Sequence, residues 1–351
     1  MISRPSLSAV PVSVSERGSV RRSSSRAGFT LVELLVVIGV IAILMALLAP
    51  AVIGAAGAAR VAAVRSDMSG MEAAISQFHA EYGRTPPSFI DLRRTSGKKF
   101  VNPATMSTLR SVFGPQIDEA TMIDSLNRMD FPGEGASGDT DFSKRGVVRG
   151  AECLVLFLGG LPASGSPTPT KELAGWSQNP RDPFNAQTKA GGFTLLDKNR
   201  RKGPFFTFEP DRLLFNNEVE GSGFTPSATG DPGVSYFTYL DTFETQTTPL
   251  IYASSDNGRG YRTQDVLYNV GVFLNDDGSA ALSQGVYQSP GGGAVNPNGY
   301  QIISPGRDGQ FGGGGSYSAD DGYTPVKDAS DQIIPGGEDN ITNFSDGMLD
   351  D

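Results

Sequence analysis

The residues best suited to chemistry lie near the N-terminus, where Gly28 and Phe29 precede Glu33 at the head of a long apolar run. A carboxylate in a membrane-spanning helix costs roughly 2.5 to 3.5 kcal/mol at the bilayer centre and less near the surface. Either Glu33 lies near the cytoplasmic face and reaches headgroup water, or it has a cationic partner. Cleavage after Gly28 would create one, because the new α-amine of Phe29 on a neighbouring copy could pair with Glu33. Such a pair in a low dielectric would favour one register between copies.

The apolar run is long enough to cross a membrane. Residues 29–53 contain Glu33 as their only charge, and about 20 mostly apolar residues span the hydrocarbon core. We expect the span at about residues 31–53. Four arginines lie in the segment 17–26 before the run, whereas only Arg60 and Arg65 lie at a similar distance after it. This bias predicts a single-pass protein whose basic leader, residues 1–28, stays in the cytoplasm while the C-terminal mass is exported.

The run Gly-Phe-Thr-Leu-Val-Glu at 28–33, followed by the apolar helix, resembles the class III signal of type IV pilins and type II secretion pseudopilins. The resemblance implies that a prepilin peptidase cuts between Gly28 and Phe29, that the Phe29 amine is then methylated, and that Glu33 guides assembly. Pro50 matches a proline often found in these helices. Implied partners are other pilin subunits, alike or different, and an inner-membrane assembly platform. The implied location is the inner membrane and then a periplasmic or extracellular filament.

Two acidic pieces near the C-terminus, residues 304–312 and 338–344, resemble the loop of the major pseudopilin that holds calcium. Calcium takes six to eight oxygen ligands from carboxylates, amides and backbone carbonyls. The resemblance names Asp308, Asp339 and Asn340 as candidate Ca²⁺ ligands, with backbone oxygens near Ser304. About 30 residues separate Asp308 from Asp339, which departs from the family pattern. The alternative is a solvated acidic turn.

Two other export signals are weaker fits. An ordinary secretory signal would use residues 34–48 as its apolar region and the small residues 56–58 as its cleavage site. That interpretation leaves Glu33 without a role. The Arg21-Arg22 pair suggests twin-arginine export, but serines rather than apolar residues follow it.

The composition favours an exported, loop-rich domain. The chain has 44 Gly and 23 Pro among 351 residues and a net charge of −9. Removing the leader leaves 24 basic and 37 acidic residues, a net charge of −13, so we expect no nucleic-acid partner. Cys153, the only cysteine, lies in an apolar segment and is expected to be a buried thiol. His79, the only histidine, is expected on a helix surface, so a zinc site or a Ser-His-Asp triad has little support.

Helical spacing continues beyond the membrane span. Apolar residues recur every three or four positions from Val61 to Tyr82, and Gly83 with Pro86-Pro87 ends the pattern. We therefore expect one helix over 29–82, with Pro50 and two glycines as sites of kinking or local melting. Short helices are expected at 102–113 and 117–129, and a helix or buried strand at 152–158. Strands are expected at 205–208, 235–240, 249–253, 269–274 and 300–304, separated by Gly/Asn/Asp turns.

These elements predict an α+β, pilin-like fold. A long N-terminal helix, membrane-spanning in its first half, packs on a C-terminal antiparallel β-sheet domain with loop-rich insertions, residues 83–351. The predicted function is that of a structural subunit of a type IV pilus or a type II secretion pseudopilus. The alternative is a membrane-anchored surface or ligand-binding protein that uses the signal only for export. A hydrolase using Asp276 and Asp277 is disfavoured, because neighbours in a strand face opposite sides.

Overall fold

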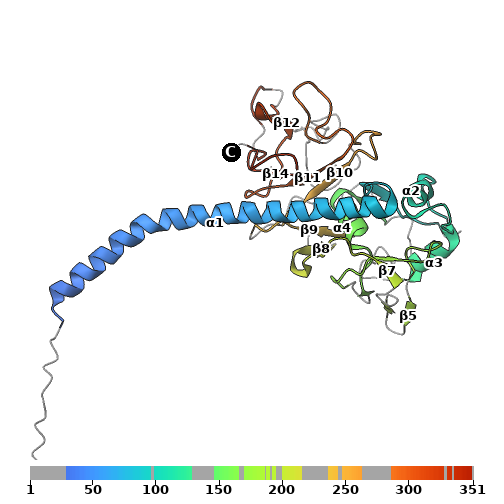
Figure 1. The fold of residues 1–351 in the computed structure, drawn as a ribbon, viewed down its shortest axis with the longest axis horizontal. Helices are drawn as coiled ribbons and strands as arrows, with labels where there is room; N and C mark the ends of the chain where they lie inside the picture. Colours follow the sequence, from blue (N-terminus) through green and yellow to red (C-terminus); the bar gives the residue numbers. More distant parts are fainter. Residues whose placement is uncertain are drawn as a thin grey trace, which may run out of the picture. The chain divides into compact units, whose positions relative to one another are not determined.

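A computed structural model describes residues 29–95, 99–128, 146–165, 170–185, 187–189, 192–194, 200–215, 236–243, 247–262, 286–327, 330–333 and 336–349. The chain separates into two units, residues 1–55 and 56–351, and helix α1 (Leu31–Tyr82) contributes to both. Figure 1 shows the order of the elements along the chain. The predicted leader, the predicted strand at 269–274 and the Asp276-Asp277 pair lie outside the described residues.

The part of α1 in the first unit is an apolar helix whose side chains are exposed. Every residue from Leu31 to Ala55 is exposed, and an 18-residue window has a mean hydropathy of 3.0. The helix continues through Pro50, so the expected local melting there is not observed. A proline removes one main-chain hydrogen bond, and the bonds of the flanking turns hold the helix together across that position. By length and composition this helix can cross a membrane.

The part of α1 in the second unit is amphipathic, as the apolar spacing predicts. The buried stripe consists of Val64, Met68, Met71, Ala74, Ile75 and Phe78. His79, next to Phe78, is exposed as expected. The helix ends where the sequence predicts, since Gly83 adopts φ 74° and its N–H donates to the His79 carbonyl at 2.8 Å.

Three shorter helices confirm the remaining helical predictions. They are α2 (Ala104–Phe113), α3 (Glu119–Arg128) and α4 (Gly150–Gly159). For the segment of α4, the sequence predicts either a helix or a buried strand. The Glu152 side chain favours the helix, because one carboxylate oxygen accepts the Arg149 N–H at 3.1 Å and caps the first turn. Its other oxygen accepts the Tyr236 N–H at 2.7 Å. Cys153 in this helix is buried, as predicted.

The second unit has a three-stranded antiparallel sheet between two hydrophobic cores. Its strands are β10 (Ile251–Ser254), β11 (Tyr300–Ser304) and β14 (Ile341–Thr342), in the order β10-β11-β14. Tyr252 and Ile302 point into the main core, which also receives the stripe of α1. Ile251 and Ile303 point into the second core. Successive side chains along β10 and β11 therefore pack into different cores, because they point to opposite faces of the sheet.

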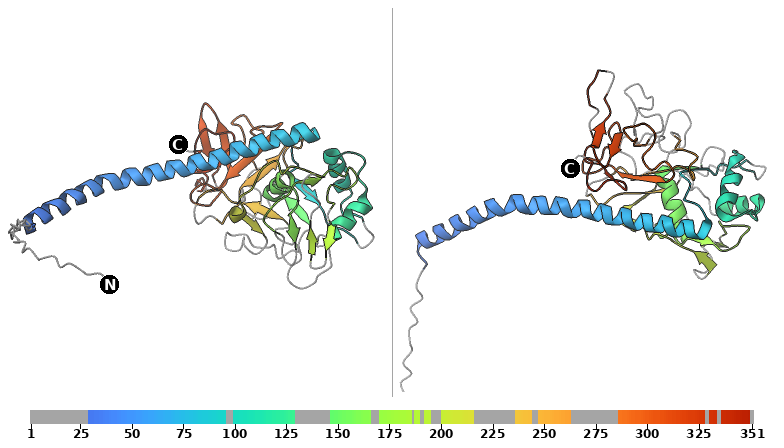
Figure 2. Two further views of the ribbon diagram at one scale, coloured as in Figure 1. Left: turned by 60° about the horizontal axis from the view of Figure 1, so that its bottom comes forward. Right: turned by 45° about the horizontal axis from the view of Figure 1, so that its top comes forward.

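The other described strands form small antiparallel sheets. The pairs are β1 (Phe89–Asp91) with β2 (Val147–Arg149), β4 (Trp176–Ser177) with β7 (Arg201–Lys202), and β8 (Leu213–Phe215) with β9 (Phe237–Tyr239). A second three-stranded sheet has the order β3 (Ser164–Gly165), β6 (Gly192–Thr194), β5 (Gln187–Lys189). The hairpin of β12 (Gly315–Ser318) and β13 (Gly322–Pro325) is drawn in orange-red in Figure 2. These sheets confirm the antiparallel α+β prediction and the strands at 235–240, 249–253 and 300–304.

The predicted strand at 205–208 is wrong. This segment is an irregular connection after β7, and the N–H groups of Phe205 and Phe206 both donate to the Leu158 carbonyl. Its aromatic rings pack on α1 instead of pairing in a sheet. The Phe205 ring lies 5.4 Å from that of Phe78, and the Phe206 ring lies over Gly70, where a Cβ would approach it to 3.1 Å. Aromatic residues suit both strands and segments that pack on helices, so aromatic composition alone wrongly predicts a strand at 205–208.

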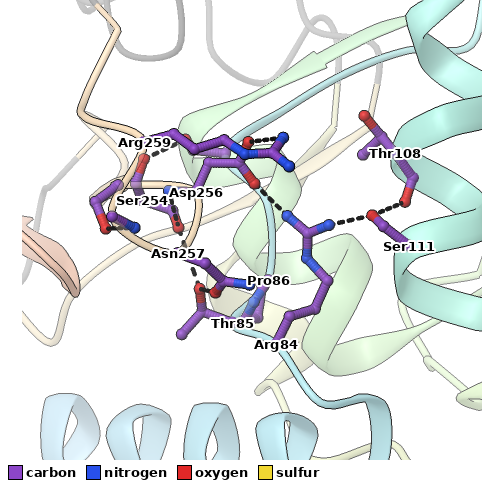
Figure 3. Close-up of polar contacts among 12 residues, drawn as sticks. Arg84, Thr85, Pro86, Thr108, Ser111, Ser254, Asp256, Asn257 and Arg259 are labelled. Carbon is purple, nitrogen blue, oxygen red and sulfur yellow. Dashed lines mark hydrogen bonds and ion pairs between the residues drawn. The ribbon is translucent and has the colours of Figure 1, made fainter.

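The residues after α1 are fastened to the turn after β10, as Figure 3 shows. The Arg84 guanidinium contacts the Asp256 carboxylate and the Ser111 hydroxyl of α2. The Arg84 side chain is 8% exposed, whereas Arg259, which binds the same carboxylate at 3.3 Å, is 80% exposed. Thr85 donates from its hydroxyl to Asn257 at 3.3 Å. Three segments distant in sequence therefore meet at Arg84.

This arrangement predicts unequal roles for two arginines on one carboxylate. Arg84→Ala is expected to lower the free energy of unfolding by about 3 kcal/mol, because it leaves a partly buried charge without its main partner. Arg259→Ala, the matched control, should cost less than about 1 kcal/mol, as exposed pairs do. Denaturant unfolding followed by fluorescence of Trp176, the only tryptophan, would measure both. Equal losses would contradict this assignment.

Candidate functional site

The first candidate site is the N-terminal end of α1, where Thr30 and Glu33 form a capping box. The Glu33 Oε2 accepts the Thr30 N–H at 2.9 Å and the Thr30 hydroxyl at 2.7 Å. The Thr30 Oγ1 in turn accepts the Glu33 N–H at 3.1 Å. This reciprocal pairing satisfies two N–H groups that the first helical turn leaves without helical partners. The first helical main-chain bond follows, from Leu34 N–H to the Thr30 carbonyl at 3.2 Å.

The capping box gives Glu33 a role that the sequence interpretation missed. The capping box could have been predicted from Thr30, because a Ser or Thr three residues before a Glu at the head of an apolar run is the signature of this cap. Both bonds accepted by the carboxylate use Oε2, so Oε1 can face an approaching group. Phe29 is 77% exposed beside it, and Gly28 lies outside the described residues. Cleavage before Phe29 would keep the capping box whole, because both of its residues follow the cut.

The second candidate site joins the two acidic pieces near the C-terminus. The Asp339 Oδ2 accepts the backbone N–H of Arg307 at 2.6 Å and of Asp308 at 3.0 Å. Gly306 adopts φ 68°, and a side chain there would collide with the backbone of Asp339. Glycine is therefore required for this close approach. The turn after β11 is thus tied to the residue just before Asn340 and β14.

The Asp308 carboxylate lies near that of Asp339. Its Oδ1 accepts the Gln310 N–H at 2.8 Å. Partial burial of this carboxylate raises the pKa of Asp308; the Gln310 hydrogen bond opposes the rise, and the negative charges of Asp339 and Glu338 add to it. The Asp339 Oδ1 is buried and has no hydrogen-bond partner among the residues that the structure describes. Negative charge therefore accumulates here, with an acceptor left unbonded.

Asn340, the third candidate ligand, faces the interior. It is fully buried, and its Nδ2 donates to the Tyr287 hydroxyl at 2.7 Å and to the Phe311 carbonyl at 3.1 Å. Burial raises the pKa of Tyr287, so this hydroxyl stays protonated. The amide therefore ties the acidic segment to the second core. Its Oδ1 is buried without a hydrogen-bond partner in the described part of the chain.

These donors fit a hard cation in part. Two carboxylates and an unbonded buried oxygen suit calcium, which prefers oxygen ligands. Among the described residues, however, no group of three or more His, Cys, Asp or Glu is placed to hold a metal ion. A calcium ion would draw its protein ligands from Asp308, Asp339 and nearby backbone or amide oxygens, with water completing the shell.

The comparison with protein families places the N-terminal site in a known class. Residues 23–49 match the model of the prokaryotic N-terminal methylation motif. The chain therefore carries an N-terminal signal of the type IV pilin and pseudopilin kind. This signal and the apolar α1 support membrane anchoring, and the signal points to a structural role rather than to catalysis. No curated protein and no solved structure matches the chain.

Proposed function

We propose that this protein is a structural subunit of a type IV pilus or of a type II secretion pseudopilus. The observation that carries the proposal is the methylation motif of residues 23–49 leading into an apolar helix whose first turn holds Glu33. The leader then faces the cytoplasm, α1 anchors the subunit in the inner membrane, and the second unit is exported. Prepilin peptidase, an assembly platform and other pilin subunits are its partners.

The capping box supports separate roles for the two carboxylate oxygens of Glu33 at the head of α1. Thr30 holds Glu33 Oε2, and Oε1 receives the α-amine of Phe29 from the next subunit. Because the carboxylate is already oriented, less side-chain entropy is lost when the amine arrives. Apolar side chains on residues 31–53 then leave lipid and pack between subunits. Charge pairing sets the register, and packing of the apolar side chains supplies the affinity.

Intact-mass and N-terminal analysis of the membrane fraction tests the processing step. We expect a chain that begins at Phe29 with one added methyl group. Gly28→Arg should leave the leader attached, because a bulky charged residue replaces the small one before the cut. Ser25→Ala is the matched control and should be processed normally. A terminus at Ala59, or an intact leader in the unaltered protein, would contradict the proposal.

We also propose that Asp308 and Asp339 bind Ca²⁺. The buried, unbonded Asp339 Oδ1 supports this, as does the raised pKa of Asp308 beside a second carboxylate. Because folding raises this pKa above the unfolded value of about 3.9, Asp308 favours the folded state at low pH. That contribution is lost as the pH rises through the folded-state pKa. Calcium would remove the penalty at neutral pH by neutralising the paired charges.

Melting of the mature protein at pH 7, in calcium or in a chelator, tests this second proposal. Calcium at 100 times its Kd should stabilise the folded state by about 2.7 kcal/mol. Asp308→Asn should melt higher than the unaltered protein in the chelator, because it removes a destabilising charge, and should gain little from calcium. Asp320→Asn, in the exposed turn between β12 and β13, is the control and should keep the full calcium response. An unaltered protein that ignores calcium would refute the site.

A further inference from the structure

An open cavity of about 580 Å³ lies in the second unit, where three segments meet. Glu72 contributes from α1, residues 296–299 from the turn before β11, and Tyr300 from the first position of β11. Asn343 and Phe344 contribute from the segment after β14. We call this cavity the amide groove. Neither the processing signal nor the candidate calcium ligands Asp308, Asp339 and Asn340 line it.

The lining of the amide groove combines amides, one carboxylate and aromatic rings. The three amides are those of Asn296, Asn298 and Asn343. Amides offer two donors and an acceptor, and a carboxylate offers acceptors, so both kinds of group can hydrogen-bond hydroxyl groups. Tyr300 and Phe344 add apolar ring surface with little loss of side-chain entropy on binding. A polar edge beside aromatic surface matches a sugar ring, which has hydroxyl edges and C–H faces.

Several groups of the groove are already held in place. Asn343 accepts the Ile302 N–H at 2.9 Å and donates to Glu72 Oε1 at 3.1 Å. Asn296 donates from its side chain to the Tyr300 carbonyl at 3.3 Å. Among the described residues, these bonds leave Glu72 Oε2, the Asn298 amide and the Tyr300 hydroxyl without a hydrogen-bond partner, and the Asn298 Oδ1 lies beside Gly258. Burial, with the nearby Glu72 charge, raises the pKa of Tyr300 to about 12, so its hydroxyl is a donor at neutral pH.

Other ligand classes fit the groove less well. Among the residues that the structure describes, no Lys, Arg or His lines the groove, and Glu72 would repel an anion. An extended peptide would need a strand edge to pair with. On one side β11 pairs with β10, and on the other it pairs with β14 and with Asn343, whose N–H donates to the Ile302 carbonyl at 3.2 Å. The groove therefore offers side-chain polar groups rather than a free backbone edge.

From this geometry we infer that the amide groove binds a neutral oligosaccharide. The inference goes beyond the filament function, because every lining residue belongs to the second unit of one copy. A filament of such subunits would carry one sugar site per subunit. A single subunit in the membrane would bind the same sugar without assembly.

Calorimetric titration of the mature full chain tests the inference. The protein is kept in a detergent without a sugar headgroup, and cellotetraose, maltotetraose and chitotetraose are the probes. We expect saturable binding of at least one of them. Asn298→Ala should weaken that binding about tenfold, which corresponds to 1.4 kcal/mol for one lost anchoring group. Tyr300→Phe removes only a hydroxyl and should weaken it several-fold.

A matched control separates recognition from folding. Gln116→Ala, in a different surface depression, should bind as the unaltered protein does. Unchanged melting of each variant excludes misfolding as the cause of a loss. Failure of all three probes, tighter binding of an acidic tetrasaccharide, or unchanged binding in both Asn298→Ala and Tyr300→Phe would overturn the inference.

Discussion

Glu33→Gln is expected to abolish filament assembly while leaving processing and membrane insertion intact. Glutamine can still accept the Thr30 hydrogen bonds, so the capped first turn should survive. What it lacks is the negative charge that the Phe29 amine of the next subunit would neutralise. An unpaired ammonium group in a membrane is costly, so polymer formation should fall to the background level. Quantifying sheared filaments by immunoblot, alongside the mass of the cellular pool, measures both outcomes.

Thr30→Ala is the complementary variant. It retains the Glu33 charge and removes the hydroxyl that both accepts and donates in the capping box. Assembly should be reduced but present, because the charge remains while only the backbone N–H of residue 30 still orients the carboxylate. Normal assembly of Glu33→Gln would show that the charge of Glu33 is not needed. If assembly were also lost in Thr30→Ala, the role of Glu33 would be capping rather than charge pairing.

Phe78→Ala is expected to cause the largest loss of stability in the second unit, about 3–5 kcal/mol. Phe78 is fully buried on α1, and its ring lies within 4.6–6.0 Å of the rings of Tyr82, Phe205 and Phe157. Removing it opens a cavity where the helix, the segment after β7 and α4 meet. Denaturant unfolding, followed by the fluorescence of the buried Trp176, measures the change.

His79→Ala is the control for this loss. It alters the neighbouring, exposed position of the same helix, so the change in unfolding free energy should stay within about 0.5 kcal/mol. A similar loss in both variants would mean that helix propensity, rather than core packing, sets stability here. A loss below about 1 kcal/mol in Phe78→Ala would mean that the surrounding rings collapse into the space.

The parts of the fold that were predictable depend on local periodicity. The stripe from Val64 to Phe78 and the stop at Gly83 follow from spacing and turn chemistry, which the sequence displays directly. The segment 205–208 was misassigned because its rings pack on α1, a contact between residues more than 120 positions apart. Aromatic composition cannot distinguish that contact from pairing with a neighbouring strand.

The candidate sites divide in the same way. Gly28, Phe29 and Glu33 lie within six consecutive residues, so the sequence alone identifies them as a signal, and Thr30 in the same run predicts the cap. The approach of Asp339 to Asp308 was expected only from resemblance, and it depends on the close contact at Gly306. The inward direction of the Asn340 amide depends on Tyr287 and Phe311, which no local pattern connects to it. The amide groove joins three separate segments of the chain, which no sequence signature connects.

The tie between Asp339 and the turn after β11 has a practical consequence for labelling this protein. The chain leaves the sheet after Ser304 and returns at Ile341. The pairing of Ser304 with Ile341 and the hydrogen bonds of Asp339 close this loop at its base. Its ends are therefore held together independently of its length, and lengthening a closed loop adds little entropic penalty. The exposed residues Asp320 and Asp321, at the far end of the hairpin, offer a place to graft an epitope or a fluorophore-binding peptide. Such a graft would make individual molecules visible in living cells and would leave the apolar N-terminal helix unchanged.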